Sequence, residues 1–132
     1  TPQTMSPPQN SEKKTDYSVL FVCLGNSCRA PMGEIVLNHL VQERLENSPI
    51  SISRIDSCGT IDYHAGDNPD PRCLETAKRF MGPNIQFSKS RKIRKTDFQE
   101  FDYILCCDRS NLEDVKNLKR KWKNGKRPIN PN

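Results

Sequence analysis

Apolar and polar positions along the chain alternate between strand-like and helix-like patterns. Residues 18–23 (SVLFVC) are apolar on both faces, which is typical of a strand buried inside a parallel sheet. The apolar side chains of the next segment are Met32, Ile35, Val36 and Leu40. Their spacing predicts a helix that begins at Pro31, ends before Pro49, and carries Glu34 away from its apolar stripe.

The remaining pattern repeats this alternation. Residues 50–56 and 103–107 predict two further strands, and residues 72–81 predict a short helix after a Gly- and Pro-rich loop over 58–71. Capping-box sequences at 96–99 and 110–113 predict a helix on each side of the last strand. Strands alternating with helices predict an α/β fold with a parallel sheet, in which ligands bind beyond the carboxyl ends of the strands.

Length and composition favour one globular domain. The chain has 132 residues, of which 33% are hydrophobic, enough for a modest core. Residues 1–16 are polar and Pro-rich, so we expect a disordered leader, a domain over 17–121 and a basic, Pro-containing tail over 122–132. The longest apolar run, residues 19–24, is far shorter than the roughly 20 residues of a membrane helix. Without a signal peptide or a membrane span, a cytoplasmic location is expected.

Charge and cysteine usage narrow the function classes. Residues 116–127 hold seven of the 21 basic residues and no acid, so the net charge of +5 comes from this segment. We interpret the segment as a solvated helix face, in preference to a contact with nucleic acid or anionic lipid. Six cysteines are too few for a disulfide scaffold of this length and lack zinc-site spacing, so we expect free thiols, no metal and no cofactor.

The candidate chemistry lies where the first strand meets the first helix, in the sequence Cys23-Leu-Gly-Asn-Ser-Cys-Arg29. A loop of this length can curl so that successive N–H groups converge on an anion, and the helix dipole adds positive charge. Arg29 can bind two phosphate oxygens with its planar guanidinium, and the same field lowers the pKa of Cys23. The predicted phosphate-binding loop consists of Leu24, Gly25, Asn26, Ser27 and Cys28. The alternative is a buried strand-end cysteine followed by an ordinary loop and a solvated arginine.

Several segments resemble the low-molecular-weight protein tyrosine phosphatases. Residues 19–31 are similar to the active-site motif of that family and residues 101–112 to a second family segment, with Asp56-Ser57 and residues 68–72 matching in order between them. The resemblance implies a three-layer, flavodoxin-like parallel sheet of the phosphotyrosine phosphatase I type. It also implies an acid-phosphatase-type hydrolase, which releases inorganic phosphate from phosphotyrosine in proteins and from small aryl phosphates through a cysteinyl-phosphate intermediate.

The resemblance also implies roles for individual residues. Cys23 would be the nucleophile and Arg29 the phosphate-binding side chain, while Ser57 would support the loop through Asn26. Cys28 resembles the second loop cysteine of the family, which forms a reversible disulfide with the nucleophile. Tyr63 matches an aromatic position beside the substrate, although it is equally consistent with a half-buried loop residue. His64 lies next to it and could touch substrate, but we favour an ordinary surface-loop histidine.

The chain departs from the family pattern at several positions. Ala30 replaces a hydroxyl residue that donates a hydrogen bond to the thiolate, and Ser88 aligns with a loop-supporting histidine and is shorter. We expect the last strand and helix of the fold, with the general-acid Asp, to be missing, and the activity to be impaired. Asp108 is the nearest acidic candidate by topology, and we favour a supporting role for it.

Other functions remain open from the sequence. Ser27 departs from the aliphatic residue usual in tyrosine-specific members, and a hydroxyl residue there is similar to protein-arginine phosphatases. A catalytically weak or inactive protein that binds phosphate or phosphotyrosine is a second alternative. An arsenate reductase is a third, but it needs further reactive cysteines, and Cys73 and Cys106 are poor candidates.

Overall fold

The computed structural model describes residues 15–123, which form an open sheet of three parallel strands. These are β1 (Asp16–Cys23), β2 (Ser51–Gly59) and β3 (Tyr103–Cys106), in the order β2-β1-β3. Central β1 is the apolar run predicted from the sequence. In register, Val22 faces Cys58 of β2 and Cys106 of β3, so all three strands end at one edge of the sheet.

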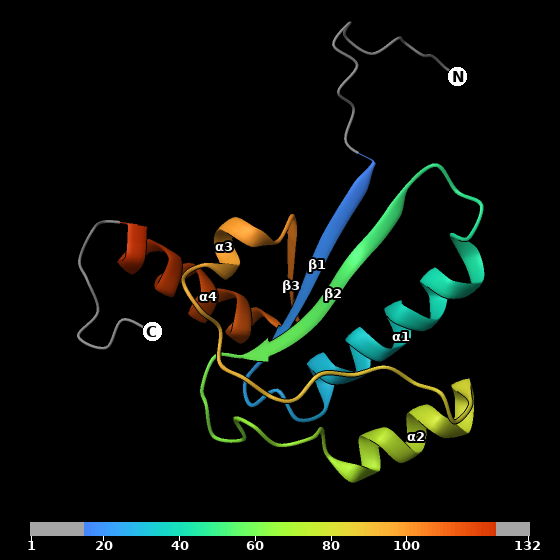
Figure 1. Ribbon diagram of the computed structural model, residues 1–132. Coiled ribbons are helices and arrows are strands. Elements are labelled where there is room, and N and C mark those ends of the chain that lie inside the picture. The colour runs from blue at the N-terminus through green and yellow to red at the C-terminus, as the bar shows by residue number, and fades with distance from the viewer. Residues whose placement is uncertain (1–14, 124–132) are drawn as a thin grey trace, which may run out of the picture.

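Helices cover both faces of the sheet in three layers (Figure 1). Helices α1 (Arg29–Arg44) and α2 (Pro71–Met81) lie on one side, and α3 (Asp97–Glu100) and α4 (Arg109–Lys123) lie on the other. The main buried cluster, between the sheet and the α3–α4 layer, consists of Leu20, Val22, Cys58, Ile93, Phe101 and Val115. The predicted three-layer, flavodoxin-like class is confirmed.

The buried face of α1 differs from the predicted stripe. The helix begins at Arg29, so Pro31 lies within its first turn, where a missing N–H costs no helical hydrogen bond. Glu34 and Ile35 are buried, whereas the side of the helix that carries Met32 borders an open groove. The stripe prediction was wrong for Glu34 because this carboxylate accepts hydrogen bonds from buried hydroxyl groups, a pairing that hydrophobic spacing cannot reveal.

The two predicted capping boxes are also corrected. The Thr96 side chain makes no capping hydrogen bond to α3. Helix α4 begins at Arg109, one residue before the predicted cap Ser110, and its N-terminus is capped by Asp108, whose Oδ1 accepts from the Asn111 N–H at 2.8 Å. Asp and Ser are both favoured at this position, so sequence alone does not choose between adjacent candidates.

The described end of the chain differs from the expected domain boundary. Helix α4 continues to Lys123 and includes Trp122, which the sequence assigned to the tail. The Trp122 ring is buried and packs edge-on against Phe98, with 5.8 Å between ring centroids. The predicted leader covers residues 1–16, but β1 already begins at Asp16. Residues 1–14 of that leader and residues 124–132 of the predicted tail lie outside the described residues. Within residues 15–123, no helix is both long and apolar enough to cross a membrane.

Strand β3 forms one edge of the sheet and leaves apolar side chains uncovered. Tyr103 is 53% exposed and Leu105 is 45% exposed. Beside them runs an open groove of about 560 Å³, which Leu105 lines together with Phe21 and Met32 and which reaches Arg29 and Cys107. The carboxyl end of β2, residues 57–59, is buried, whereas no residue of β3 is buried.

Candidate functional site

The loop between β1 and α1 curls around the sulfur of Cys23. Asn26 has a φ of 57°, a left-handed conformation that a short polar side chain tolerates, and its N–H donates to Cys23 Sγ at 3.1 Å. The neighbouring strand approaches closely: a Cβ atom on Gly59 would lie 2.5 Å from the Leu24 carbonyl oxygen and 3.1 Å from the Asn26 nitrogen. Glycine is therefore required at position 59 for this loop shape.

The carbonyl groups of the loop are bound on its outer side. Thr60 N–H donates to Cys23 O at 3.0 Å, Ile61 N–H to Leu24 O at 3.1 Å, Asp70 N–H to Ser27 O at 2.7 Å and Met32 N–H to Cys28 O at 2.9 Å. The Ser90 hydroxyl donates to Asn26 O. With the carbonyl oxygens held outward, N–H groups are left at the centre of the loop, which is the arrangement that binds an anion.

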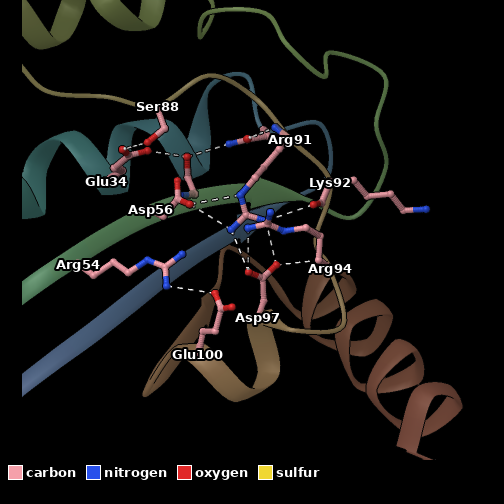
Figure 2. A network of polar contacts seen from close by, with 11 residues as sticks. Glu34, Arg54, Asp56, Ser88, Arg91, Lys92, Arg94, Asp97 and Glu100 are labelled. Atoms are coloured by element: carbon pink, nitrogen blue, oxygen red, sulfur yellow. Dashed lines mark hydrogen bonds and ion pairs between the residues drawn. The ribbon is translucent and has the colours of Figure 1, made fainter. Parts of the chain in front are cut away.

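A buried chain of polar side chains supports the loop from the side of β2. Asn26 Nδ2 donates to Ser57 Oγ at 3.0 Å, and Ser57 Oγ donates to Glu34 Oε1 at 2.7 Å. The contact expected between Asn26 and Ser57 is present. Ser88 Oγ donates to Glu34 Oε2 at 2.7 Å, so this serine reaches the loop only through Glu34 (Figure 2). Burial raises the pKa of Glu34, opposed by the hydroxyl groups of Ser57 and Ser88.

A second, largely buried group of side chains binds the Oδ1 end of the Asn26 amide. Asn26 Oδ1 accepts a hydrogen bond from the Arg91 backbone N–H at 2.9 Å. The Arg91 guanidinium in turn binds Asp56 Oδ2 at 3.1 Å and Asp97 Oδ2 at 2.9 Å (Figure 2). The Asp97 side chain is fully buried. Sequence reasoning missed Glu34, Ser90, Arg91 and Asp97. Each lies in a helix or loop whose local pattern gives no sign of a distant partner, so their role appears only once the fold is known.

The surroundings of Cys23 favour a thiolate. The side chain is almost fully buried, and its pKa is lowered to about 6 by a hydrogen bond with Cys107 and by the N–H groups of Ala30, Asn26 and Ser27, against the opposing effect of burial. The pKa of Cys107 shifts in the opposite direction: the Cys23 side chain raises it most, and partial desolvation of this largely exposed residue adds to the rise. Sequence reasoning did not assign Cys107 to the site.

Arg29 and Asp108 face each other at the open side of the loop. Arg29 Nη1 lies 2.7 Å from Asp108 Oδ2, and both side chains are about half exposed. The hydrogen bond with Arg29, together with that from the Asn111 N–H, lowers the pKa of Asp108. The lowered pKa keeps Asp108 ionised, and its carboxylate accepts a hydrogen bond from the Arg29 guanidinium.

The predicted substrate-side residues lie on the loop after β2. Tyr63 is 78% exposed, and its ring packs edge-on against His64 with 4.7 Å between centroids. His64 lies against the phosphate-binding loop, since a Cβ atom on Gly25 would be 3.2 Å from His64 Cδ2. His64 therefore stands beside the loop, with the Tyr63 ring packed against it.

All six cysteines are free, including Cys28, which is exposed at the end of the loop. Cys28 O accepts a hydrogen bond from Cys73 Sγ at 3.5 Å. Within residues 15–123, no group of three or more His, Cys, Asp or Glu side chains is placed to hold a metal ion. The chemistry that these residues offer is anion binding beside a thiolate.

Comparisons with known proteins agree with this geometry. Residues 18–127 match the family model for low molecular weight phosphotyrosine protein phosphatase. A Dictyostelium discoideum protein of that name is 39% identical over 120 residues, which cover 83% of this chain and 65% of the relative, so the chain spans about two thirds of that relative's length.

Two solved structures are similar. The low molecular weight protein tyrosine phosphatase of Streptococcus pyogenes has a TM-score of 0.65 at 32% identity, and the match covers 79% of this chain and 65% of that one. A Drosophila arginine phosphatase has a TM-score of 0.66 at 34% identity, with 76% and 60% covered.

Proposed function

This chain belongs to the low molecular weight phosphotyrosine protein phosphatase family, and we propose that it hydrolyses phosphate monoesters of phenols, phosphotyrosine in proteins included, through a phosphorylated Cys23. The observation that carries the proposal is the loop of residues 23–29. Its amide groups converge on a buried sulfur whose pKa is lowered to about 6, and its arginine stands at the open side. A thiolate and an anion-binding loop in one segment meet the needs of phosphoryl transfer through a covalent intermediate.

The proposed reaction has two steps. The Cys23 thiolate attacks phosphorus, so that an S–P bond forms while the P–O bond breaks and its electron pair leaves with the phenol oxygen. Water then attacks phosphorus, the S–P bond breaks with its electron pair returning to sulfur, and inorganic phosphate is released. The amides of residues 24–28 and the Arg29 guanidinium stabilise the phosphoryl oxygens in both steps.

The state of Asp108 affects which substrates react well. Because this carboxylate is held ionised by Arg29, it does not protonate the leaving oxygen. General acid catalysis contributes about 10² to 10⁴ in rate, and a substrate with an acidic phenol depends on it least. We therefore expect the 132-residue chain to favour p-nitrophenyl phosphate over phosphotyrosine peptides, which is the impairment expected from the sequence.

Phosphoarginine is a second candidate substrate. The observations that favour it are the similarity to the Drosophila arginine phosphatase and the small hydroxyl side chain of Ser27 in the loop. The two phosphorylated side chains differ in their leaving group, a phenol oxygen against a guanidinium nitrogen. Parallel assays with phosphotyrosine and phosphoarginine peptides distinguish the two substrates.

An arsenate reductase is less favoured, because burial raises the pKa of both Cys73 and Cys106 and makes them poor reducing thiols.

A burst experiment tests the proposal. On rapid mixing with excess p-nitrophenyl phosphate, the protein should release about one equivalent of nitrophenol per site and become phosphorylated on Cys23. Cys23→Ser should abolish both the burst and turnover. Arg29→Ala should lower kcat/KM by about 10²- to 10³-fold, as expected for the loss of a major oxyanion contact. Phosphate binding without a burst or turnover would instead identify a binding protein, and full activity in Cys23→Ser would refute the assignment.

A further inference from the structure

Cys107 lies beside Cys23 because of the register of the sheet. Val22 pairs with Cys106, and the Cys107 N–H donates to Val22 O at 2.9 Å, so the ladder between β1 and β3 continues to the residue pair Cys23 and Cys107. Neighbouring strands are about 4.8 Å apart, and paired residues point to the same face. The two sulfur atoms are accordingly placed together where the strands end.

The side-chain contacts agree with this placement. The two side chains act on each other's ionisation: Cys107 lowers the pKa of Cys23, and Cys23 raises that of Cys107. Cys107 lines the groove that also contains Arg29 and Cys28, on the face of the sheet that carries the phosphate-binding loop. The adjacent Cys106 packs against the buried cluster on the opposite face of the sheet. Of the two successive cysteines, Cys107 is the one that faces the loop.

The other hydrogen bonds that favour a charged Cys23 sulfur come from backbone N–H groups, those of Asn26, Ser27 and Ala30. Ala30 has only a methyl group and cannot add a side-chain donor. We propose that Cys107 supplies the side-chain donor: the Cys107 thiol donates a hydrogen bond to Cys23 Sγ and stabilises that sulfur as a thiolate. The inference deepens the proposed phosphatase function and makes Cys107 a catalytic residue in contact with the reacting atom.

The direction of the hydrogen bond follows from the charged groups around the pair. The Cys23 sulfur accepts hydrogen bonds from the loop N–H groups, whereas the Cys107 sulfur accepts none of these. Cys107 also lies near the Asp108 carboxylate, whose negative charge opposes ionisation of the Cys107 thiol. The Arg29 guanidinium acts on both sulfurs and favours the anion at each. The thiol of Cys58, fully buried in β2, stays protonated because burial raises its pKa. The proton of the pair therefore stays on Cys107, and Cys107 is the donor.

The same bond acts at both ends of the proposed reaction. Before attack it increases the fraction of Cys23 present as thiolate at neutral and mildly acidic pH. In the second step sulfur leaves phosphorus as a thiolate, and a donor to that sulfur makes it a better leaving group. Loss of the Cys107 donor should therefore lower kcat and increase the fraction of protein trapped as cysteinyl phosphate.

The test measures the ionisation of Cys23 directly. The rate of alkylation by iodoacetamide is followed against pH, and tandem mass spectrometry locates the modified residue at Cys23. The unmodified protein should show a midpoint near pH 6, the value set by the Cys107 hydrogen bond and the loop amides. Because a hydrogen bond to an anion is worth about one to two pKa units, Cys107→Ala should raise the midpoint by about that amount.

Two further variants make the test selective. Cys107→Ser keeps a donor and should give a midpoint closer to that of the unmodified protein than to that of Cys107→Ala. Cys106→Ala, at the neighbouring position on the opposite face, should leave the midpoint unchanged. An unchanged midpoint in Cys107→Ala, or an equal shift in Cys106→Ala, overturns the inference. If Cys107→Ala fails to fold, Cys107→Val decides, because valine fills the site without a hydrogen-bond donor: a raised midpoint supports the inference, and an unchanged midpoint overturns it.

Alkylation does not require turnover, so this inference and the proposed function fail separately. A shifted midpoint without hydrolysis of p-nitrophenyl phosphate supports the role of Cys107 and refutes the phosphatase. Hydrolysis with an unshifted midpoint supports the phosphatase and refutes the role of Cys107.

Discussion

The two sides of the phosphate-binding loop are built differently. On the side of β2, Asn26 is held by a buried network that reaches Glu34 through Ser57 and reaches Asp97 through Arg91. On the side of β3, the loop meets exposed side chains: the half-exposed pair Arg29 and Asp108, the exposed Cys107, and the open groove. The hydrogen bonds on the β2 side are buried or partly buried, whereas the β3 side carries solvent-exposed charges and thiols.

The difference separates shape from reactivity. The buried network fixes backbone positions, which must be rigid if several N–H groups are to point at one anion before it arrives. The exposed side carries the groups that change charge or contact substrate. We therefore expect substitutions on the β2 side to lower stability together with activity, and substitutions on the β3 side to change activity or pH dependence at nearly constant stability.

The largest effect on stability should come from Asp97. Asp97→Ala removes a fully buried carboxylate and leaves Asp56 as the one carboxylate bound to the Arg91 guanidinium. The free energy of unfolding should therefore fall by about 3–5 kcal/mol, as for other broken buried pairs. Urea denaturation measures the loss. The matched control is Glu100→Ala, which breaks the half-exposed pair with Arg54 and should cost less than about 1 kcal/mol. Similar losses in the two variants would contradict the contrast between buried and exposed pairs.

An intermediate effect is expected at Ser57. Ser57→Ala removes the hydroxyl between Asn26 Nδ2 and Glu34 Oε1, and the free energy of unfolding should fall by about 1–3 kcal/mol. Ser53→Ala, on the same strand but exposed, should change it by less than about 0.5 kcal/mol.

The Ser57 effect should also depend on pH. Burial raises the pKa of Glu34 above its unfolded value, so this carboxyl favours folding below the unfolded pKa, and that contribution is lost as pH rises through the folded pKa. The Ser57 hydroxyl opposes this shift, and its removal matters most when Glu34 is ionised. The loss in Ser57→Ala should therefore be larger near about pH 7 than near about pH 4. A loss independent of pH would show that Glu34 does not feel the substitution.

The residues of the phosphate-binding loop could be predicted from the sequence, whereas most of the buried side chains that hold the loop in place could not. The placement of Cys23 and Arg29 follows from local rules, because a buried strand running into a helix turns its connecting loop toward the carboxyl edge of the sheet. Glu34 was assigned to the solvent side of α1, since hydrophobic periodicity treats every carboxylate as exposed. Its hydroxyl partners, Ser57 and Ser88, lie 23 and 54 residues away, a separation that local patterns do not report.

Cys107 was missed for a related reason. Its position at the end of the apolar run 103–107 is typical of a buried strand residue, as is that of Cys106. Which of two adjacent cysteines faces the loop depends on strand register, and register is set by pairing with another strand. The pairing of Val22 with Cys106 places Cys107 opposite Cys23.

The smallest effect should come from Asp108, where one substitution separates two roles. Asp108 caps α4 through the Asn111 N–H and binds Arg29 through its other oxygen. Asn is as good an N-cap as Asp, so Asp108→Asn removes the charge and keeps the cap, and the melting temperature should hardly change. Asp108→Ala removes both and should lower the melting temperature further.

Kinetics of the same variants decide between orientation and proton transfer. Because the bond to Arg29 keeps Asp108 ionised, we expect Asp108→Asn to change kcat for p-nitrophenyl phosphate and for a phosphotyrosine peptide by the same small factor. A general acid would behave otherwise: kcat for the peptide would fall by about 10² to 10⁴ while kcat for the nitrophenyl ester changed little, since only the poorer leaving group needs the proton. A selective loss on the peptide would place the reactive acid on the exposed side of the loop, and equal small losses leave Asp108 as the residue that orients Arg29.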